Sequence, residues 1–140
     1  MLIIEHGTND YNSGVRLDNE QDLYDEDTFG GGLRSVLKRL RETYPNLRIV
    51  LVTPAYCEVG GAHSSDDKDW GGGYLYQYVG KEIEIAKQFQ VDVIDMYHNS
   101  GIHKGNVKDY TTDGLHLNDS GVALWGEKIA DYLKGYVYED

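Results

Sequence analysis

Residues 48–53 read RIVLVT, a run of β-branched and apolar residues between Asn46 and Pro54. A run of this kind, bounded by turn-forming residues, is typical of a short strand. Because the run is apolar throughout and does not alternate with polar residues, it predicts a strand covered on both faces, as in a parallel sheet. The stretch therefore indicates an α/β fold with this strand inside the sheet.

Helices are predicted on either side of this strand, because apolar residues recur there every three or four positions. The first helix spans residues 29–44, with Phe29, Leu33, Val36, Leu37, Leu40 and Tyr44 on its apolar face and Arg34, Lys38, Arg39 and Arg41 on its solvent face. The second spans residues 75–89, with Leu75, Val79, Ile83, Ala86 and Phe89 on its apolar face and Lys81, Glu82 and Glu84 facing water.

Two further strands and a last helix complete the pattern. Residues 1–6, MLIIEH, predict a short buried strand, and residues 91–96, VDVIDM, predict a third strand. Asn118 is placed to cap the last helix, whose inner face is Val122, Trp125, Ile129 and Leu133. The alternation of strand and helix predicts one domain over residues 1–140, with a parallel sheet and right-handed crossovers.

Two polar segments interrupt this pattern. Residues 18–27, DNEQDLYDED, hold six carboxylates in ten positions, which predicts a solvated loop. A calcium loop is the alternative, although the EF-hand spacing and its closing glutamate are missing. Residues 60–73 are rich in Gly, Ser and Asp and predict a mobile loop. This loop is not a phosphate-binding loop, since no Lys-Ser or Lys-Thr pair follows at the required spacing.

The composition excludes several classes of protein. The formal net charge of -11 argues against nucleic acid or an anionic membrane as the main partner. We expect no membrane span and no signal peptide, because no apolar run approaches about 18 residues and the N-terminus lacks a basic region. Cys57 is the only cysteine, so an internal disulfide is excluded and a cytoplasmic location is expected. The 12 tyrosines indicate half-exposed surfaces around a polar substrate.

Two predicted loops at the carboxyl ends of strands carry candidate functional residues. Asp113 precedes His116 by three residues, a spacing at which the carboxylate can orient the imidazole as the base half of a hydrolytic triad. The alternative is that Asp113 only starts a turn. In residues 7–10, GTND, Asn9 is a possible donor to an oxyanion, with Gly7 keeping the backbone close to the substrate. The alternative here is a simple turn that ends the strand.

Taken together, these two blocks resemble the SGNH hydrolases, also called GDSL lipases and esterases. Residues 49–56, IVLVTPAY, and residues 91–101, VDVIDMYHNSG, are also similar to that family. The resemblance covers essentially the whole chain and implies a flavodoxin-like three-layer α/β/α fold, reduced here to about three strands. It implies that His116 is the general base, Asp113 its orienting carboxylate and Asn9 an oxyanion donor beside Gly7. Leu117 departs from the family, which often has proline there.

The family's serine nucleophile lies in a Gly-Asp-Ser block after its first strand, and its oxyanion glycine follows the second strand. We expect both to be absent here, with the chain starting at the family's third strand and lacking roughly 60 residues, two βα units. No serine takes the role by its position, whether Ser13, Ser35, Ser64, Ser65 or Ser120. Cys57 is a weak alternative, because no neighbouring cation is visible to lower its pKa.

The other histidines suggest no second site. His6 ends a strand and is expected to be packed or hydrogen-bonded, whereas His63, His98 and His103 are expected to be solvated. Their spacing matches no zinc motif, so we expect no metal and no cofactor.

The sequence therefore predicts a partial ester hydrolase that is inactive alone and whose substrate class is an acyl-ester small molecule or an acylated carbohydrate. The alternative is a non-catalytic binding or assembly module on the same fold. We also expect a homodimer, formed through the open edge of the strand from Leu2 to His6 or through adjacent apolar surface.

Overall fold

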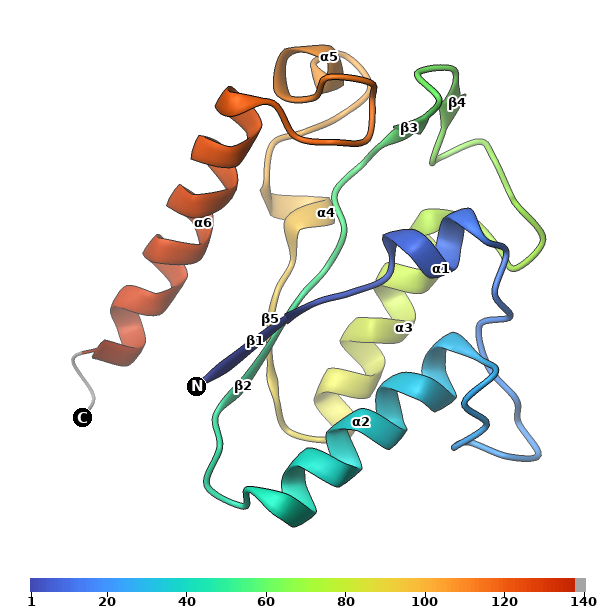
Figure 1. Cartoon of the computed structure of the whole chain (residues 1–140), viewed down its shortest axis with the longest axis vertical. Coiled ribbons are helices and arrows are strands. Elements are labelled where there is room, and N and C mark those ends of the chain that lie inside the picture. The colour runs from blue at the N-terminus through green and yellow to red at the C-terminus, as the bar shows by residue number, and fades with distance from the viewer. Residues whose placement is uncertain (138–140) are drawn as a thin grey trace.

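The computed structural model describes residues 1–137 and contains the predicted parallel sheet (Figure 1). Its three strands are β1 (Leu2–Glu5), β2 (Ile49–Val52) and β5 (Asp92–Ile94), in the order β1-β2-β5. Ile3 pairs with Val50, and Leu51 pairs with Val93. All four residues of β2 are buried, as expected for the central strand.

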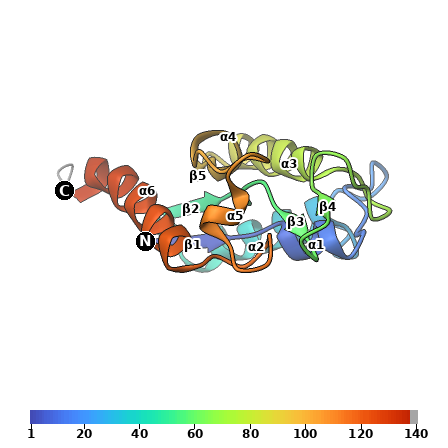
Figure 2. The same cartoon turned by 90° about the horizontal axis from the view of Figure 1, so that it is seen from above.

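Helices cover the two faces of this sheet and give the predicted three layers (Figures 1 and 2). One face packs against α2 (Phe29–Thr43) and α3 (Leu75–Gln88), through a cluster that includes Leu37, Leu51 and Ile85. The other face packs against α6 (Asp119–Val137), whose Trp125 and Ile129 contact a cluster containing Val50 and Val52. Asn118 caps α6 as predicted, since its Oδ1 accepts a hydrogen bond from the backbone N–H of Gly121 at 2.9 Å.

Several short elements were not predicted, because they are too short to show a periodic pattern. They are α1 (Thr8–Asn12), α4 (Met96–Asn99), α5 (Val107–Tyr110), and the antiparallel strands β3 (Glu58–Val59) and β4 (His63–Ser64). The prediction of a mobile loop over residues 60–73 thus missed a hairpin, whose turn uses Gly60 and Gly61 at φ 65° and 70°.

The predictions for Arg34 and Asp18 were wrong. Arg34 was expected on the solvent face of α2, yet its side chain is only 4% exposed. Both of its terminal nitrogens donate to the carboxylate of Asp18, at 2.8 and 2.9 Å, and Lys81 adds an ion pair at 3.2 Å. The acidic segment is therefore not simply solvated, because Asp18 folds back and neutralises a cation between α2 and α3.

Four other side chains also depart from the predicted faces. Glu82 was expected to face water but is fully buried on α3. Val36 on α2, Tyr44 just after α2 and Val122 on α6 were expected on apolar faces and are 47%, 58% and 60% exposed. A sheet of three strands is narrow, so the outer parts of each predicted apolar face extend beyond the strands they were expected to cover.

Strand β1 is an edge strand, and the prediction that it is buried was wrong. Within residues 1–137 it pairs only with β2, and Leu2 and Ile3 are 36% and 38% exposed. One row of its backbone N–H and C=O groups is therefore open to another strand, and neither Leu2 nor Ile3 carries a charge that would prevent such pairing.

We propose that two copies of the chain associate through this edge, by antiparallel pairing about a two-fold axis. Sedimentation equilibrium is expected to give a concentration-dependent dimer. Replacing Ile3→Lys places a charge on the edge and should give a monomer, whereas Leu23→Lys, at another exposed leucine, should leave the dimer intact. A monomer for the unchanged chain, or equal dimerisation of all three proteins, would refute this proposal.

Candidate active site

Asp113 and His116 form a hydrogen-bonded pair on the turn before α6. The carboxylate Oδ2 of Asp113 lies 2.6 Å from Nδ1 of His116. Its Oδ1 accepts the backbone N–H groups of His116 and Leu115, at 2.8 and 3.0 Å. These bonds fix the imidazole with Nδ1 toward the carboxylate and Nε2 away from it. A carboxylate holds the ring of an oriented general base in the same way.

Backbone contacts with the β3–β4 hairpin hold this turn in place. The backbone N–H of Glu58 donates to the carbonyl of Gly114 at 2.8 Å. Gly114 has φ 90°, and a Cβ at this position would lie 2.4 Å from the carbonyl oxygen of Glu58. Only glycine fits this turn, because any side chain would displace the hairpin.

The pKa of Asp113 is lowered to about 2, first by the backbone N–H of His116 and then by its imidazole and the N–H of Leu115. We expect a carbon-detected NMR titration to find this low value. In His116→Ala the backbone bonds remain, so the pKa should rise only part of the way to 3.8. An unchanged pKa in this variant would show that the imidazole does not contact the carboxylate in solution.

The segment from Gly7 to Asp10 begins where β1 ends. It was predicted as a loop, but its residues from Thr8 onward form the short helix α1. Gly7 is buried at φ 124°, and a Cβ there would lie 2.9 Å from the ring of Pro54. Asn9 is exposed, and its side-chain amide takes part in none of the hydrogen bonds found within residues 1–137. The amide is therefore free to donate to a substrate oxygen.

Both segments border one small pocket at the carboxyl end of the sheet. The pocket has a volume of about 80 Å³ and is lined by Thr8, next to Asn9, and by Leu115 and Leu117, which flank His116. In Figure 1, α1 and the turn before α6 lie at the same end of the strands. This is the end at which α/β sheets bind ligands.

A second pair, Asp95 and His98, has nearly the same local geometry and was not predicted. Oδ2 of Asp95 lies 2.6 Å from Nδ1 of His98, and its Oδ1 accepts the backbone N–H of His98 at 3.0 Å. The sequence interpretation placed His98 in a solvated loop, whereas it lies on α4 with its side chain 60% exposed. The shared Asp-x-x-His spacing was the available signal. Neither this pair nor Asp113 and His116 line the pocket that Thr8 and Leu115 border.

No candidate nucleophile meets His116. Within residues 1–137, no hydroxyl or thiol hydrogen-bonds its imidazole. Ser65 is buried and accepts the backbone N–H of Cys57 at 3.1 Å. Cys57 lines the pocket, but burial raises the pKa of its thiol to about 11. A thiol with this pKa is almost entirely protonated at neutral pH and is a poor nucleophile.

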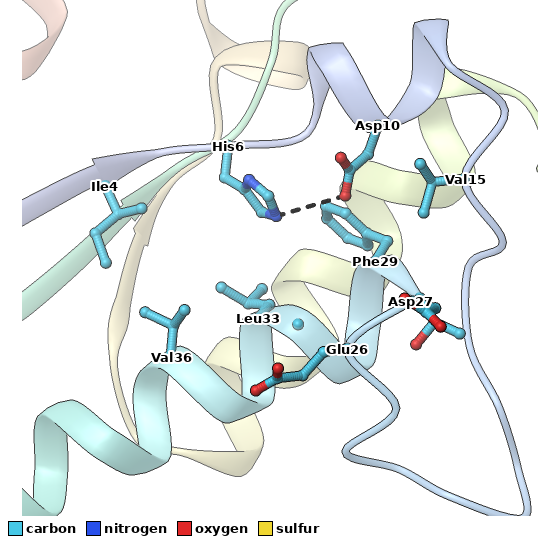
Figure 3. A pocket seen from close by; sticks show the side chains of 11 residues that line it. Ile4, His6, Asp10, Val15, Glu26, Asp27, Phe29, Leu33 and Val36 are labelled. Atoms are coloured by element: carbon cyan, nitrogen blue, oxygen red, sulfur yellow. Dashed lines mark ion pairs between the residues drawn. The ribbon is translucent and has the colours of Figure 1, made fainter.

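His6 lies in a different, larger pocket of about 480 Å³ beside β1 and α2 (Figure 3). Its ring stacks on Phe29, with the ring centroids 4.9 Å apart, and its Nε2 lies 3.9 Å from Asp10. Burial lowers the pKa of His6 despite the charge of Asp10. This packing agrees with the prediction for His6.

No three His, Cys, Asp or Glu side chains in residues 1–137 gather as ligands of a metal ion. None of the helices described there combines the length and apolarity needed to cross a bilayer.

Comparison with known proteins identifies the family. Residues 1–124 match the model of the GDSL-like lipase/acylhydrolase family. The match covers most of the chain, and the chain therefore belongs to this family, as the resemblance implied. A comparison with curated protein sequences gives no match.

Solved structures share the fold at low sequence identity. A protein from Lactobacillus plantarum is 22% identical with a TM-score of 0.84, covering 95% of this chain and 65% of that one. A possible lipase from Chitinophaga pinensis is 21% identical with a TM-score of 0.75, covering 96% and 72%. A lipase/acylhydrolase from Enterococcus faecalis is 21% identical with a TM-score of 0.63, covering 96% and 60%. The chain thus spans somewhat less than two thirds of the first of these structures.

Proposed function

We propose that this chain carries the base and oxyanion half of an ester-hydrolase site, and that its serine nucleophile is not among these 140 residues. The observation that carries the proposal is the pocket bordered by Thr8, Leu115 and Leu117, which joins the segments of Asn9 and His116. The substrate class is an acyl-ester small molecule or an acylated carbohydrate.

The proposed roles follow from the geometry. His116 takes the proton of the attacking hydroxyl at Nε2 and later returns it to the leaving alcohol, while Asp113 stabilises the imidazolium. The side-chain amide of Asn9 donates to the oxyanion that forms as the carbonyl carbon becomes tetrahedral. Gly7 allows the chain to turn from β1 into α1 against the ring of Pro54, which places Asn9 on α1. A serine attacking the ester would form an acyl-enzyme, which water then hydrolyses.

Binding of an unreacted ester tests this arrangement. Methyl acetate is expected to shift the backbone NMR signals of Thr8, Asn9, Leu115 and His116 together. Replacing Asn9→Ala or His116→Ala should weaken this binding by about tenfold, the effect of losing one hydrogen bond of about 1.4 kcal/mol. The matched controls Asn99→Ala and His98→Ala should bind as the unchanged chain does. No shift at these residues, or equal weakening by the controls, would overturn the proposal.

We expect the chain alone to have no appreciable esterase activity. Even complete oxyanion holes retain only about 10³–10⁴-fold acceleration over water when triad residues are removed, and this site also lacks the family's oxyanion glycine. The measurement is hydrolysis of p-nitrophenyl acetate, compared with a mock preparation. Turnover that exceeds the mock preparation and disappears in His116→Ala would contradict this prediction.

A lack of esterase activity in the chain alone is also expected for the alternative, a non-catalytic binding module. The absence of any hydroxyl or thiol bonded to His116 within residues 1–137 favours this alternative. Joining the missing Gly-Asp-Ser strand from a structural relative to this chain separates the two. Gain of esterase activity that needs both Asn9 and His116 supports the hydrolase, whereas a folded chimera without activity supports the binding module.

A further inference from the structure

Glu82 is a buried acid to which the proposed mechanism gives no role. Its side chain extends from the middle of α3 and is fully buried, and neither of its carboxyl oxygens has a hydrogen-bond partner within residues 1–137. A buried polar group without a partner costs free energy, so the presence of this acid in the fold calls for a reason other than packing.

The carboxyl group of Glu82 lies against the turn from β1 into α1. A Cβ added to Gly7 would lie 3.7 Å from Oε2 of Glu82 and 2.9 Å from the ring of Pro54. Gly7 is itself buried, and its backbone N–H donates none of the hydrogen bonds found within residues 1–137. An acid without a donor and an N–H without an acceptor are therefore neighbours at this turn.

The same face of α3 also supports the rest of α1. Tyr78 precedes Glu82 by one helical turn, and its ring contacts that of Tyr11 on α1, with the ring centroids 5.9 Å apart. The hydroxyl of Tyr78 donates to the carbonyl of Val15, which follows α1. Two side chains one turn apart on α3 thus contact both ends of α1, the helix that carries Asn9.

The packing of Glu82 depends on its proton. A neutral carboxyl group can stay away from water, whereas an ionised one without a counterion draws water in or moves toward it. Burial, reinforced by the charges of Asp95 after β5 and of Glu5 on β1, raises the pKa of Glu82 to about 9. The group is therefore neutral at pH 7 and ionises only in alkaline solution.

Titratable and charged groups also come from the other elements around this acid. Burial raises the pKa of Tyr11 on α1 and of Tyr78 on α3 to about 12, and that of Cys57 after β2 to about 11. Burial lowers the pKa of His6, which lies beside Asp10, from 6.5. The charged groups between α2 and α3 form one ion-paired set, Arg34, Asp18 and Lys81.

We infer that Glu82 is a positioning residue of the candidate site: its neutral carboxyl group supports the turn at Gly7 and keeps Asn9 in place relative to His116, and its ionisation releases this turn. The inference rests on the proposed function, because the position of α1 matters only if Asn9 and His116 act in one site. Ester binding is then lost in alkaline solution, although Glu82 does not touch the substrate.

A pH titration followed by carbon-detected NMR tests the inference without a ligand. Between pH 7 and pH 10, the backbone signals of Gly7, Thr8 and Asn9 are expected to shift together, with a midpoint near pH 9. Glu82→Gln keeps the size of the side chain but cannot ionise, so the transition should disappear. The matched control Glu84→Gln, whose side chain is 52% exposed on the same helix, should keep it.

Ester binding gives the functional measurement. At pH 10 only about one chain in ten keeps the proton on Glu82, so methyl acetate should bind the unchanged chain about tenfold more weakly at pH 10 than at pH 8. Glu84→Gln should show the same loss of affinity. Glu82→Gln should bind methyl acetate equally at the two pH values.

Glu82→Met covers the case in which Glu82→Gln does not fold, and it should also abolish the transition. A transition that persists in both variants, or signals of residues 7–9 that do not change up to pH 10, would overturn the inference and leave the proposed function intact. Equal binding of methyl acetate by the unchanged chain at pH 8 and pH 10 would do the same. Failure of methyl acetate to shift Asn9 and His116 at pH 8 would instead overturn the proposed function.

Discussion

Replacing Glu82→Gln is expected to raise the free energy of unfolding at pH 7 by about 3 kcal/mol. Glu82 is fully buried on α3, and neither of its oxygens has a hydrogen-bond partner among residues 1–137. Burial, reinforced by the charges of Asp95 and Glu5, raises its pKa from 4.5 to about 9. Folding at pH 7 must therefore protonate a carboxylate that is ionised in the unfolded chain, and glutamine removes this cost.

The pH dependence gives the sign of the effect. Because the folded pKa of Glu82 is raised, its favourable contribution is complete below pH 4.5 and is lost as the pH rises to about 9. Within this window the folding equilibrium constant should fall by about tenfold per pH unit from this group alone. Urea unfolding at a series of pH values measures the free energy of unfolding. The slope of this free energy against pH should be smaller in Glu82→Gln than in the unchanged chain.

The matched control for this prediction is Glu84→Gln on the same helix. Glu84 is 52% exposed and pairs with Lys81 at 3.0 Å, so its replacement should change stability by less than about 1 kcal/mol. Equal effects of the two substitutions, or a loss of stability in Glu82→Gln at pH 8, would contradict the burial of an unpaired carboxyl.

Replacing Asp18→Ala is expected to destabilise the chain by about 3 kcal/mol, because it leaves Arg34 buried without its main counterion. The Arg34 side chain is 4% exposed and that of Asp18 is 15% exposed. The hydrogen bond from Arg34, helped by that from Lys81, lowers the pKa of Asp18 far below 3.8. Chemical denaturation at neutral pH measures the loss.

The ion pair between Arg39 and Glu26 provides the control. It has a similar length of 2.9 Å, but its side chains are 75% and 56% exposed. Glu26→Ala should therefore change stability by less than about 1 kcal/mol. If Asp18→Ala were equally mild, the acidic segment would be the solvated loop that its composition predicts.

The elements that the sequence predicted correctly depend on local patterns. The apolar run of residues 48–53 contains β2, and Asn118 caps α6 because a capping side chain acts within its own turn. The hydrogen bond between Asp113 and His116 is local in the same sense, since three residues separate the partners. Gly7 and Asn9 could be placed at a strand end, although their roles with His116 remain proposals.

The errors concern side chains whose surroundings come from distant segments. Helical spacing places Glu82 on the polar side of α3, and only the folded chain shows that Glu5 and Asp95 lie close enough to affect it. Arg34 is buried because Asp18, 16 residues earlier, returns to meet it. Val36 is exposed because β1 has no second neighbour within residues 1–137 to extend the sheet beneath it.

The central claim is that Asn9 and His116 belong to one site, and paramagnetic relaxation in solution tests it most directly. A nitroxide attached through Asn9→Cys, in a Cys57→Ser background, broadens NMR signals of nearby backbone amides. If the two residues belong to one site, strong broadening is expected at Leu115, His116 and Leu117 and none at Gln90, which lies in the turn between α3 and β5, at the amino end of the sheet. Unbroadened signals at residues 115–117, with broadening at Gln90, would contradict the account.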